Sequence, residues 1–130
     1  MAKTKVLFIC IENANRSQMA EGFAHAFGGD MIEPYSAGSK PRGEINPKAI
    51  EFMRELDIDI STQSSTGFDD LPTHEFDYVV TMGCGDVCPY VPAKQHLDWD
   101  LSDPKSLPPD EFRAVRDEIG RRVKVLIEGM

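Results

Sequence analysis

An apolar run near the N-terminus, followed by a polar loop and an amphipathic segment, limits the folds open to this chain. The residues "KVLFI" (5–9) are typical of a short parallel strand that is covered on both faces. The segment "SQMAEGFAHAF" (17–27) carries its apolar side chains on one helical stripe, and two glycines follow it. The residues between these segments are therefore expected to form a strand-to-helix turn.

The rest of the chain continues the alternation of strands and helices. Further strands are predicted at 31–38, 77–82 and 94–99, and further helices at 47–57 and 109–126. Asn46 and Pro47 are typical of a helix start. Alternation of this kind indicates an α/β fold: a single doubly wound domain over residues 1–130, with a four-stranded parallel sheet flanked by helices. Ligands of such sheets bind at the carboxyl ends of the strands.

Charge and hydropathy exclude several classes of partner. The formal net charge of −8 disfavours binding to nucleic acid or to an anionic membrane, although a small anion can still occupy a locally positive pocket. No apolar stretch approaches the roughly 20 residues of a membrane span. The N-terminal apolar run stops at Glu12 and Asn13, too early for a signal peptide. The chain is expected to be cytoplasmic.

The loop "CIENANRS", Cys10 to Ser17, has the features of an oxyanion site. A turn that enters a helix can direct successive backbone N–H groups at one centre, and the helix N-terminus adds partial positive charge. The planar fork of Arg16 can bind two oxygens of a tetrahedral anion, and Asn13 suits a left-handed backbone. The predicted oxyanion-binding residues are Ile11, Glu12, Asn13, Ala14, Asn15, Arg16 and Ser17.

Cys10 lies at the base of this loop, facing the expected anion. The field of the helix N-terminus favours a thiolate there. Ser17 either donates a hydrogen bond to that thiolate or caps the helix. Glu12 is compatible with anion binding because such a ring of N–H groups, called a nest, uses the backbone of Glu12 and leaves its carboxylate to face solvent. The sequence assigns this side chain no further role.

Three cysteines, Cys10, Cys84 and Cys88, do not indicate a structural disulfide framework in a reducing compartment. Buried packing is the plain alternative for each. Cys84 and Cys88 are spaced C-x3-C without a second pair, and the three histidines have no matching spacing, so no metal site is predicted. Glycines around both cysteines are typical of a flexible loop that can change conformation and so move a thiol.

The stretch "CIENANRSQMAEGF" resembles the anion-binding loop and first helix of the low-molecular-weight protein tyrosine phosphatase superfamily, and most closely its thioredoxin-coupled arsenate reductase branch. The segments "YSAG", "NPKAIEFMRELDIDIS", "DYVVTM", "DWDLSDP" and "EFRAVRDEI" resemble the same branch in order and spacing. The resemblance covers nearly the whole chain, from about Val6 to Val125.

The resemblance implies a general acid at Asp103, in the Asp-Pro pair of "LSDPKS"; composition alone indicates only a turn there. Lys105 and Ser106 follow, where phosphatases of this type generally carry aromatic residues that stack on a phenol ring. "RSQMAE" also resembles the reductases, whereas "RSP" is usual for the phosphatases. The differences favour a reductase over an aromatic phosphatase.

The implied reaction is reduction of arsenate to arsenite, for arsenic detoxification. Cys10 attacks arsenic, and one thiol of the pair Cys84 and Cys88 then attacks the sulfur of Cys10 to form a disulfide. The second thiol of the pair moves the disulfide to the loop, where thioredoxin reduces it. Which of the two attacks Cys10 first stays open. The cycle needs no cofactor. A low-molecular-weight thiol with a glutaredoxin-like protein is the alternative reductant.

At two positions, Thr66 and Asn15, the sequence differs from the pattern of some relatives. Some relatives bind a cation through residues corresponding to Asn13, Glu21 and Ser36, but Thr66 replaces the completing carboxylate, so none is predicted here. Some relatives carry an extra cysteine at the position of Asn15. Without it, any resolving thiol must come from Cys84, Cys88 or a separate molecule.

Two alternatives to a reductase remain. Cys10, Arg16 and Asp103 alone would suffice for a phosphomonoester hydrolase acting on phosphate esters. A noncatalytic oxyanion-binding protein is the third possibility, although it has no need of a thiol and an acid.

Overall fold

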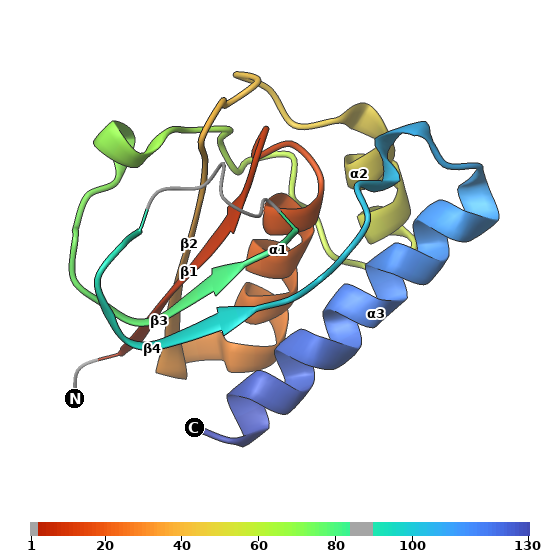
Figure 1. Ribbon diagram of the computed structural model, residues 1–130. Coiled ribbons are helices and arrows are strands. Elements are labelled where there is room, and N and C mark those ends of the chain that lie inside the picture. Colours follow the sequence, from red (N-terminus) through yellow and green to blue (C-terminus); the bar gives the residue numbers. More distant parts are fainter. Residues whose placement is uncertain (1–2, 84–89) are drawn as a thin grey trace.

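The computed structural model describes residues 3–83 and 90–130, so the predicted relay residues Cys84 and Cys88 lie outside the described residues. The described strands and helices follow one another along the chain in the order that the hydrophobic pattern predicts (Figure 1). The strands are β1 (Thr4–Cys10), β2 (Ile32–Gly38), β3 (Phe76–Thr81) and β4 (Ala93–Asp98). The helices are α1 (Arg16–Gly28), α2 (Pro47–Arg54) and α3 (Pro109–Glu128), with short 3-10 turns η1 (Gly29–Met31), η2 (Phe68–Asp70) and η4 (Pro104–Ser106).

The four strands form one parallel sheet in the order β2-β1-β3-β4. The chain leaves β1 for β2 on one side and later returns to place β3 on the other side. The strand order therefore reverses between the carboxyl ends of β1 and β3, which is where open α/β sheets bind ligands. Cys10, paired in register with Gly38, is the last residue of β1. The predicted α/β fold with a four-stranded parallel sheet is confirmed.

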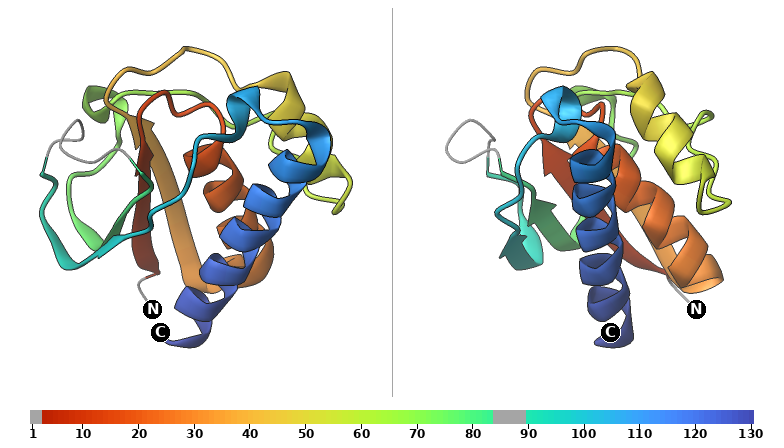
Figure 2. Two further views of the ribbon diagram at one scale, coloured as in Figure 1. Left: turned by 45° about the vertical axis from the view of Figure 1, so that its right-hand side comes forward. Right: turned by 90° about the vertical axis from the view of Figure 1, so that its right-hand side faces the viewer.

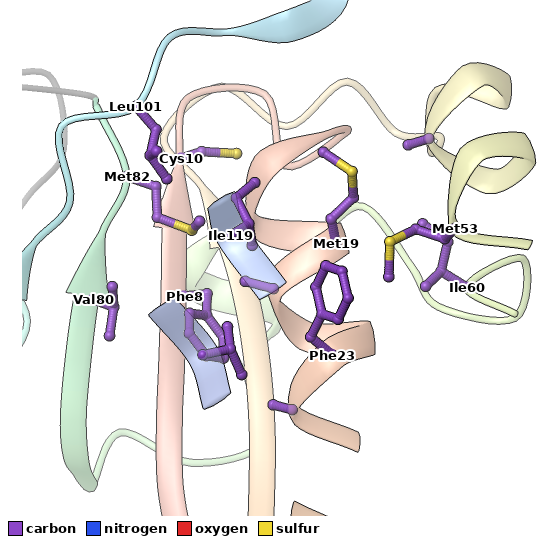
Figure 3. Packing of buried hydrophobic residues seen from close by; sticks show 14 of the residues in the cluster. Phe8, Cys10, Met19, Phe23, Met53, Ile60, Val80, Met82, Leu101 and Ile119 are labelled. Atoms are coloured by element: carbon purple, nitrogen blue, oxygen red, sulfur yellow. The ribbon is translucent and has the colours of Figure 1, made fainter. Parts of the chain in front are cut away.

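Side chains of β1 alternate between two buried clusters, which explains its unbroken apolar run. Val6 and Phe8 pack in the larger cluster with apolar residues of α1, α2 and α3 (Figure 3). Leu7 and Ile9 lie in the second cluster, where residues in and near η2 and the segment before β4 pack against them. In the views of Figure 2 the three helices lie together on one side of the sheet. Both faces of β1 are thus covered.

Helix α2 is shorter than predicted, ending at Arg54 instead of Asp57. The backbone N–H of Ile58 bonds to the carbonyl of Met53 at 3.2 Å, and Asp57 has a φ of 61°. This is a left-handed termination of the helix by a residue other than glycine. The apolar spacing of the sequence continues past the end because Leu56 and Ile58 follow in the terminating turn.

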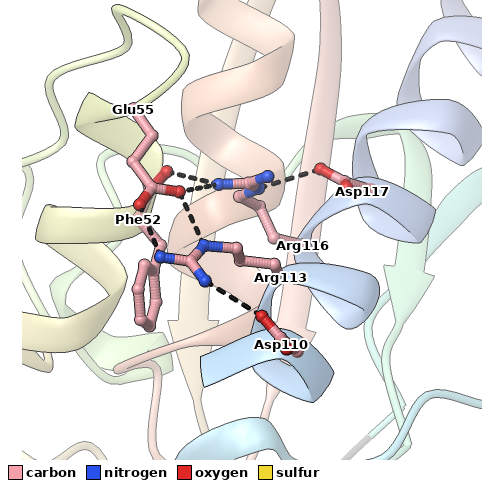
Figure 4. Close-up of polar contacts among 6 residues, drawn as sticks. All are labelled: Phe52, Glu55, Asp110, Arg113, Arg116 and Asp117. Atoms are coloured by element: carbon pink, nitrogen blue, oxygen red, sulfur yellow. Dashed lines mark hydrogen bonds and ion pairs between the residues drawn. The ribbon is translucent and has the colours of Figure 1, made fainter. Parts of the chain in front are cut away.

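Arg116 and Glu55 join α3 to the end of α2 (Figure 4). Arg116 is 6% exposed, and its Nη1 donates to Glu55 Oε1 at 2.6 Å and to the Phe52 carbonyl at 2.9 Å. Arg113 adds two hydrogen bonds to the same carboxylate and stacks over the Phe52 ring at 4.9 Å. Hydrogen bonds from Arg113 and Arg116 lower the pKa of Glu55 to about 2.

Neither α3 nor any shorter helix in the described ranges combines the length and apolarity that crossing a membrane requires.

Candidate active site

Cys10 is buried at the carboxyl end of β1, with 2% of its surface exposed. Its Sγ lies 2.8 Å from the Oγ of Ser17, in the first turn of α1. The thiol therefore lies where the carboxyl edge of the sheet meets the N-terminus of α1, within hydrogen-bond distance of a hydroxyl. Figure 3 shows Cys10 at the upper end of the core, beside Met82 and Leu101.

The backbone of the loop after Cys10 turns its carbonyl groups outward. Each carbonyl from Ile11 to Asn15 accepts a hydrogen bond, from Lys40 N, Arg42 N, Gln18 Nε2, Asn46 N and Met19 N in turn. The N–H groups of residues 12–15 donate to no acceptor within 3–83 and 90–130. Because these N–H groups have no acceptor among the described residues, they are available to an oxyanion, as the nest prediction requires.

Gly38 allows β2 to approach this loop closely. A Cβ at Gly38 would lie 2.6 Å from the Ile11 carbonyl oxygen and 2.9 Å from the Asn13 nitrogen. Both atoms belong to backbone that is fixed on its other side, so a side chain at this position would displace the loop. The glycine that ends β2 and the "YSAG" segment thus contributes directly to the geometry of the site.

Asn13 has a φ of 51°, which confirms the left-handed backbone expected there. The backbone N–H of Thr66 donates to its Oδ1 at 2.8 Å, which fixes the orientation of the amide. Its Nδ2 then donates to Ser17 Oγ at 2.7 Å. Gln18, fully buried, donates to the same Oδ1 at 3.1 Å. Two donors thus hold the Asn13 amide in one orientation.

Ser17 is a thiol partner, the first of the two roles that the sequence left open. Its Oγ accepts a hydrogen from Asn13, so its own hydrogen is free for the sulfur of Cys10. The residue preceding α1, Asn15, makes no side-chain capping bond. When Cys10 is a thiolate, only the hydroxyl can be the donor in this pair.

Arg16 is 4% exposed, and its Nη1 donates to the Leu101 carbonyl at 3.0 Å. This bond leaves several of the five guanidinium donors for other acceptors. Gly83, with a φ of 81°, lies against both groups: a Cβ there would be 2.6 Å from Arg16 Nη1 and 2.4 Å from Leu101 O. Gly83 is also the last described residue before the segment that contains Cys84 and Cys88.

Asp103 is exposed and precedes η4, where its Oδ1 accepts from Lys105 N at 3.1 Å. One carboxylate oxygen is therefore occupied by the backbone. The Nζ of Lys105 lies 3.2 Å from each carboxylate oxygen of Glu12. The Glu12 carboxylate, expected to face solvent, is instead paired, and the pair joins the Asp103 segment to the loop after Cys10.

A protein-family model described as low molecular weight phosphotyrosine protein phosphatase matches residues 5–130. The chain belongs to this family. The match spans the sheet, the loop after Cys10 and all three α-helices, which agrees with the fold and site described above.

Several members of the phosphatase family that are similar to this chain are arsenate reductases. One from Halalkalibacterium halodurans is 44% identical, with 98% of each chain covered. The structure of an arsenate reductase in the phosphate binding state superposes with a TM-score of 0.87 at 37% identity, over 97% of this chain and 98% of the other. The structure of Cg_ArsC1', a thioredoxin-dependent arsenate reductase of Corynebacterium glutamicum, has a TM-score of 0.78 to this chain. The two are 36% identical, and the match covers 98% of this chain and 61% of the other. The resemblance predicted from the sequence is confirmed.

Some residues of this phosphatase-family site were not identified from the sequence. Thr66 and Leu101 act through backbone groups that are distant in sequence from their partners, and Gln18 acts through its side chain on the Asn13 carbonyl. No motif spacing marks such contacts. Lys105 was noted only as a departure from the phosphatases. The available signal was the sequence itself, in which a lysine lies two residues after Asp103 and a carboxylate, Glu12, lies in the loop after Cys10.

Glu21, Ser36 and Thr66 form a separate polar group beside the loop. Ser36 Oγ donates to Glu21 Oε1 at 2.6 Å, and Thr66 Oγ1 donates to the Ser36 carbonyl at 3.3 Å. The described ranges contain no cluster of three or more His, Cys, Asp or Glu side chains suited to a metal ion.

Proposed function

We propose that the protein reduces arsenate to arsenite, with Cys10 as the nucleophile. The observation that carries this proposal is the buried Cys10 thiol, 2.8 Å from a hydroxyl donor and at the base of a loop in which the N–H groups of residues 12–15 have no acceptor among the described residues. The similar arsenate reductases support the same activity. Arsenate suits the loop because it is a tetrahedral oxyanion.

The first step is displacement at arsenic. The Cys10 thiolate forms an S–As bond while one As–O bond breaks, and Asp103 gives the departing oxygen the proton with which it leaves as water. The loop N–H groups and the free donors of Arg16 hold the remaining negative charge. Ser17 stabilises the thiolate before attack and is released when the sulfur becomes covalently bound.

The second step transfers two electrons to arsenic. A thiolate from Cys84 attacks Cys10 Sγ, an S–S bond forms, and the electron pair of the S–As bond passes to arsenic, which leaves as arsenite. Cys88 then attacks Cys84, which frees Cys10 and leaves a Cys84–Cys88 disulfide. Both cysteines lie outside the described residues, so their order of attack is inferred from the family resemblance.

The proposed reductant of that disulfide is thioredoxin. The similarity to Cg_ArsC1', which is thioredoxin-dependent, supports it. A low-molecular-weight thiol with a glutaredoxin-like protein is the alternative. Each route supplies the two electrons from a dithiol or two thiols in a reducing compartment, in keeping with a cytoplasmic location. The reaction calls on no organic cofactor or metal ion.

The test is a steady-state comparison of two substrates. Arsenate-dependent NADPH oxidation is measured with thioredoxin and thioredoxin reductase, beside hydrolysis of p-nitrophenyl phosphate. We expect arsenate turnover that Cys10→Ser abolishes and that Cys84→Ser and Cys88→Ser reduce at least tenfold. Rapid phosphate ester hydrolysis with no arsenate turnover would instead establish the phosphatase alternative.

A further inference from the structure

We propose that Lys105 is a positioning residue that acts through Glu12. Their ion pair holds the Asp103 segment against the oxyanion loop and offsets the negative charge that follows the nucleophile. This inference rests on the proposed function and adds a determinant of its first step.

The pair connects two segments far apart in the sequence. Lys105 Nζ lies 3.2 Å from both Oε1 and Oε2 of Glu12, and the two side chains are 46% and 32% exposed. On the loop side, the Glu12 carbonyl accepts from Arg42 N at 2.9 Å and from Ser65 Oγ at 3.2 Å. The carboxylate therefore projects from a fixed backbone, and less conformational entropy is lost when the pair forms.

Lys105, the second residue of the pair, also forms a hydrogen bond with Asp103, the proposed acid. Lys105 N donates to Asp103 Oδ1 at 3.1 Å, so the residue that binds Glu12 through its side chain binds Asp103 through its backbone. On the opposite side of Asp103, the Leu101 carbonyl accepts from Arg16 at 3.0 Å. The Asp103 segment is thus attached to the oxyanion loop two residues before and two residues after the acid.

The charge of Glu12 gives the pair a second effect. A carboxylate two residues after Cys10 opposes both a thiolate and an incoming oxyanion, and a partly buried charge is screened less than an exposed one. Lys105 contacts both of its oxygens and therefore offsets that repulsion. Removing Lys105 alone leaves Glu12 unpaired, whereas removing both side chains removes the repulsion together with the tether.

Three variants, Lys105→Gln, Glu12→Gln and the double variant, distinguish the two effects of the ion pair. These effects are attachment of the Asp103 segment to the oxyanion loop and neutralisation of the Glu12 charge. The single-turnover rate of arsenite formation at saturating arsenate reports the position of Asp103. Protection of Cys10 from iodoacetamide by inorganic phosphate reports anion affinity. All three variants should slow the single turnover about two- to fivefold, the range expected for an exposed ion pair. Only Lys105→Gln should weaken phosphate protection, by a similar factor.

Lys94→Gln is the matched control, because Lys94 forms an exposed ion pair with Asp77 at 3.0 Å, at the opposite end of β3 and β4. It removes the same charge and should change neither quantity. A wild-type turnover rate in Glu12→Gln, or phosphate protection in Lys105→Gln equal to that in Lys94→Gln, would overturn the proposal. A wild type that forms no arsenite contradicts the proposed function instead, and the phosphate measurement then decides the role of the pair.

Discussion

The Oγ of Ser17 lies 2.8 Å from the Sγ of Cys10 and accepts a hydrogen bond from Asn13 Nδ2 at 2.7 Å. The backbone N–H of Thr66, the Asn13 amide and the Ser17 hydroxyl therefore form a chain of hydrogen bonds that ends on the sulfur of Cys10. The chain begins at the backbone N–H of Thr66, 53 residues along the sequence from Asn13. The direction of each hydrogen bond follows from that N–H, which can only donate.

Ser17→Ala should make Cys10 less reactive. A hydrogen bond to a charged group contributes about 1.5–3 kcal/mol, and about 1.4 kcal/mol corresponds to a factor of ten. Alkylation of Cys10 by iodoacetamide at pH 7 should therefore slow about tenfold or more. Ser39→Ala is the control, because Ser39 Oγ is buried without a hydrogen-bond partner in the described structure. Equal rates in the two variants would show that Ser17 does not stabilise the thiolate.

Asn13→Asp should have an effect at least as large. An aspartate accepts hydrogen bonds but cannot donate one to Ser17, so the hydroxyl hydrogen turns from the sulfur to the new carboxylate. Iodoacetamide alkylation should again slow at least tenfold. Thr66→Val keeps the N–H that binds Asn13 Oδ1 and should alkylate at the wild-type rate. A slow Thr66→Val variant would mean that the side chain of Thr66, and not its backbone, controls the site.

Gly83→Ala should disturb the site more than Gly43→Ala. Both glycines have a positive φ, of 81° and 91°, so each substitution incurs backbone strain of about 1–3 kcal/mol. Only at Gly83 would the new Cβ meet other groups, Leu101 O at 2.4 Å and Arg16 Nη1 at 2.6 Å. Urea unfolding should show both variants destabilised, and phosphate protection of Cys10 should weaken in Gly83→Ala alone. Unchanged phosphate protection there would contradict the placement of Arg16.

The Glu55 contacts should make stability depend on pH in acid. The folded pKa of Glu55 is about 2, against an ordinary value of 4.5, mainly because Arg113 and Arg116 donate to it. A lowered folded pKa means that the contribution to stability is complete above about pH 4.5 and is lost as the pH falls toward 2. Urea unfolding should show wild type more stable than Glu55→Gln at pH 6, with the difference shrinking between pH 4.5 and 2.

Glu51→Gln on the same helix is the control for this titration, because the Glu51 carboxylate forms no ion pair within the described ranges. Its difference from wild type should stay constant over the same range of pH. A Glu55→Gln difference that is independent of pH would show that the two arginines do not favour the ionised carboxylate.

The fold was predictable because its main signals are local. The apolar run of β1 and the stripes of α1 and α3 follow directly from burial of those elements on the sheet. The end of α2 was not predictable, because apolar residues continue past Arg54 and the left-handed Asp57 carries no glycine signal. The position of Cys10 at the carboxyl edge of the sheet followed from the alternation of strands and helices, whereas the strand order that places β1 beside the reversal is seen only in the structure.

The site was predictable in its types of residue and less so in its contacts. Cys10, Arg16 and the left-handed Asn13 follow from the chemistry of a strand-to-helix turn. The pairing of Glu12 with Lys105 joins residues 93 positions apart, and the bond from Arg16 to Leu101 joins residues 85 apart. Such contacts depend on how loops meet at the sheet edge, which a single sequence does not encode in any local pattern.

A single turnover without reductant tests the central claim most directly. Reduced protein is mixed with excess arsenate, and arsenite and free thiols are counted. The account predicts one arsenite per chain, the loss of two thiols, and no arsenite from Cys10→Ser. In Cys88→Ser, mass spectrometry should find a disulfide between Cys10 and Cys84. Arsenite formation by Cys10→Ser, or the loss of thiols with no arsenite, would contradict Cys10 as the nucleophile that reduces arsenate.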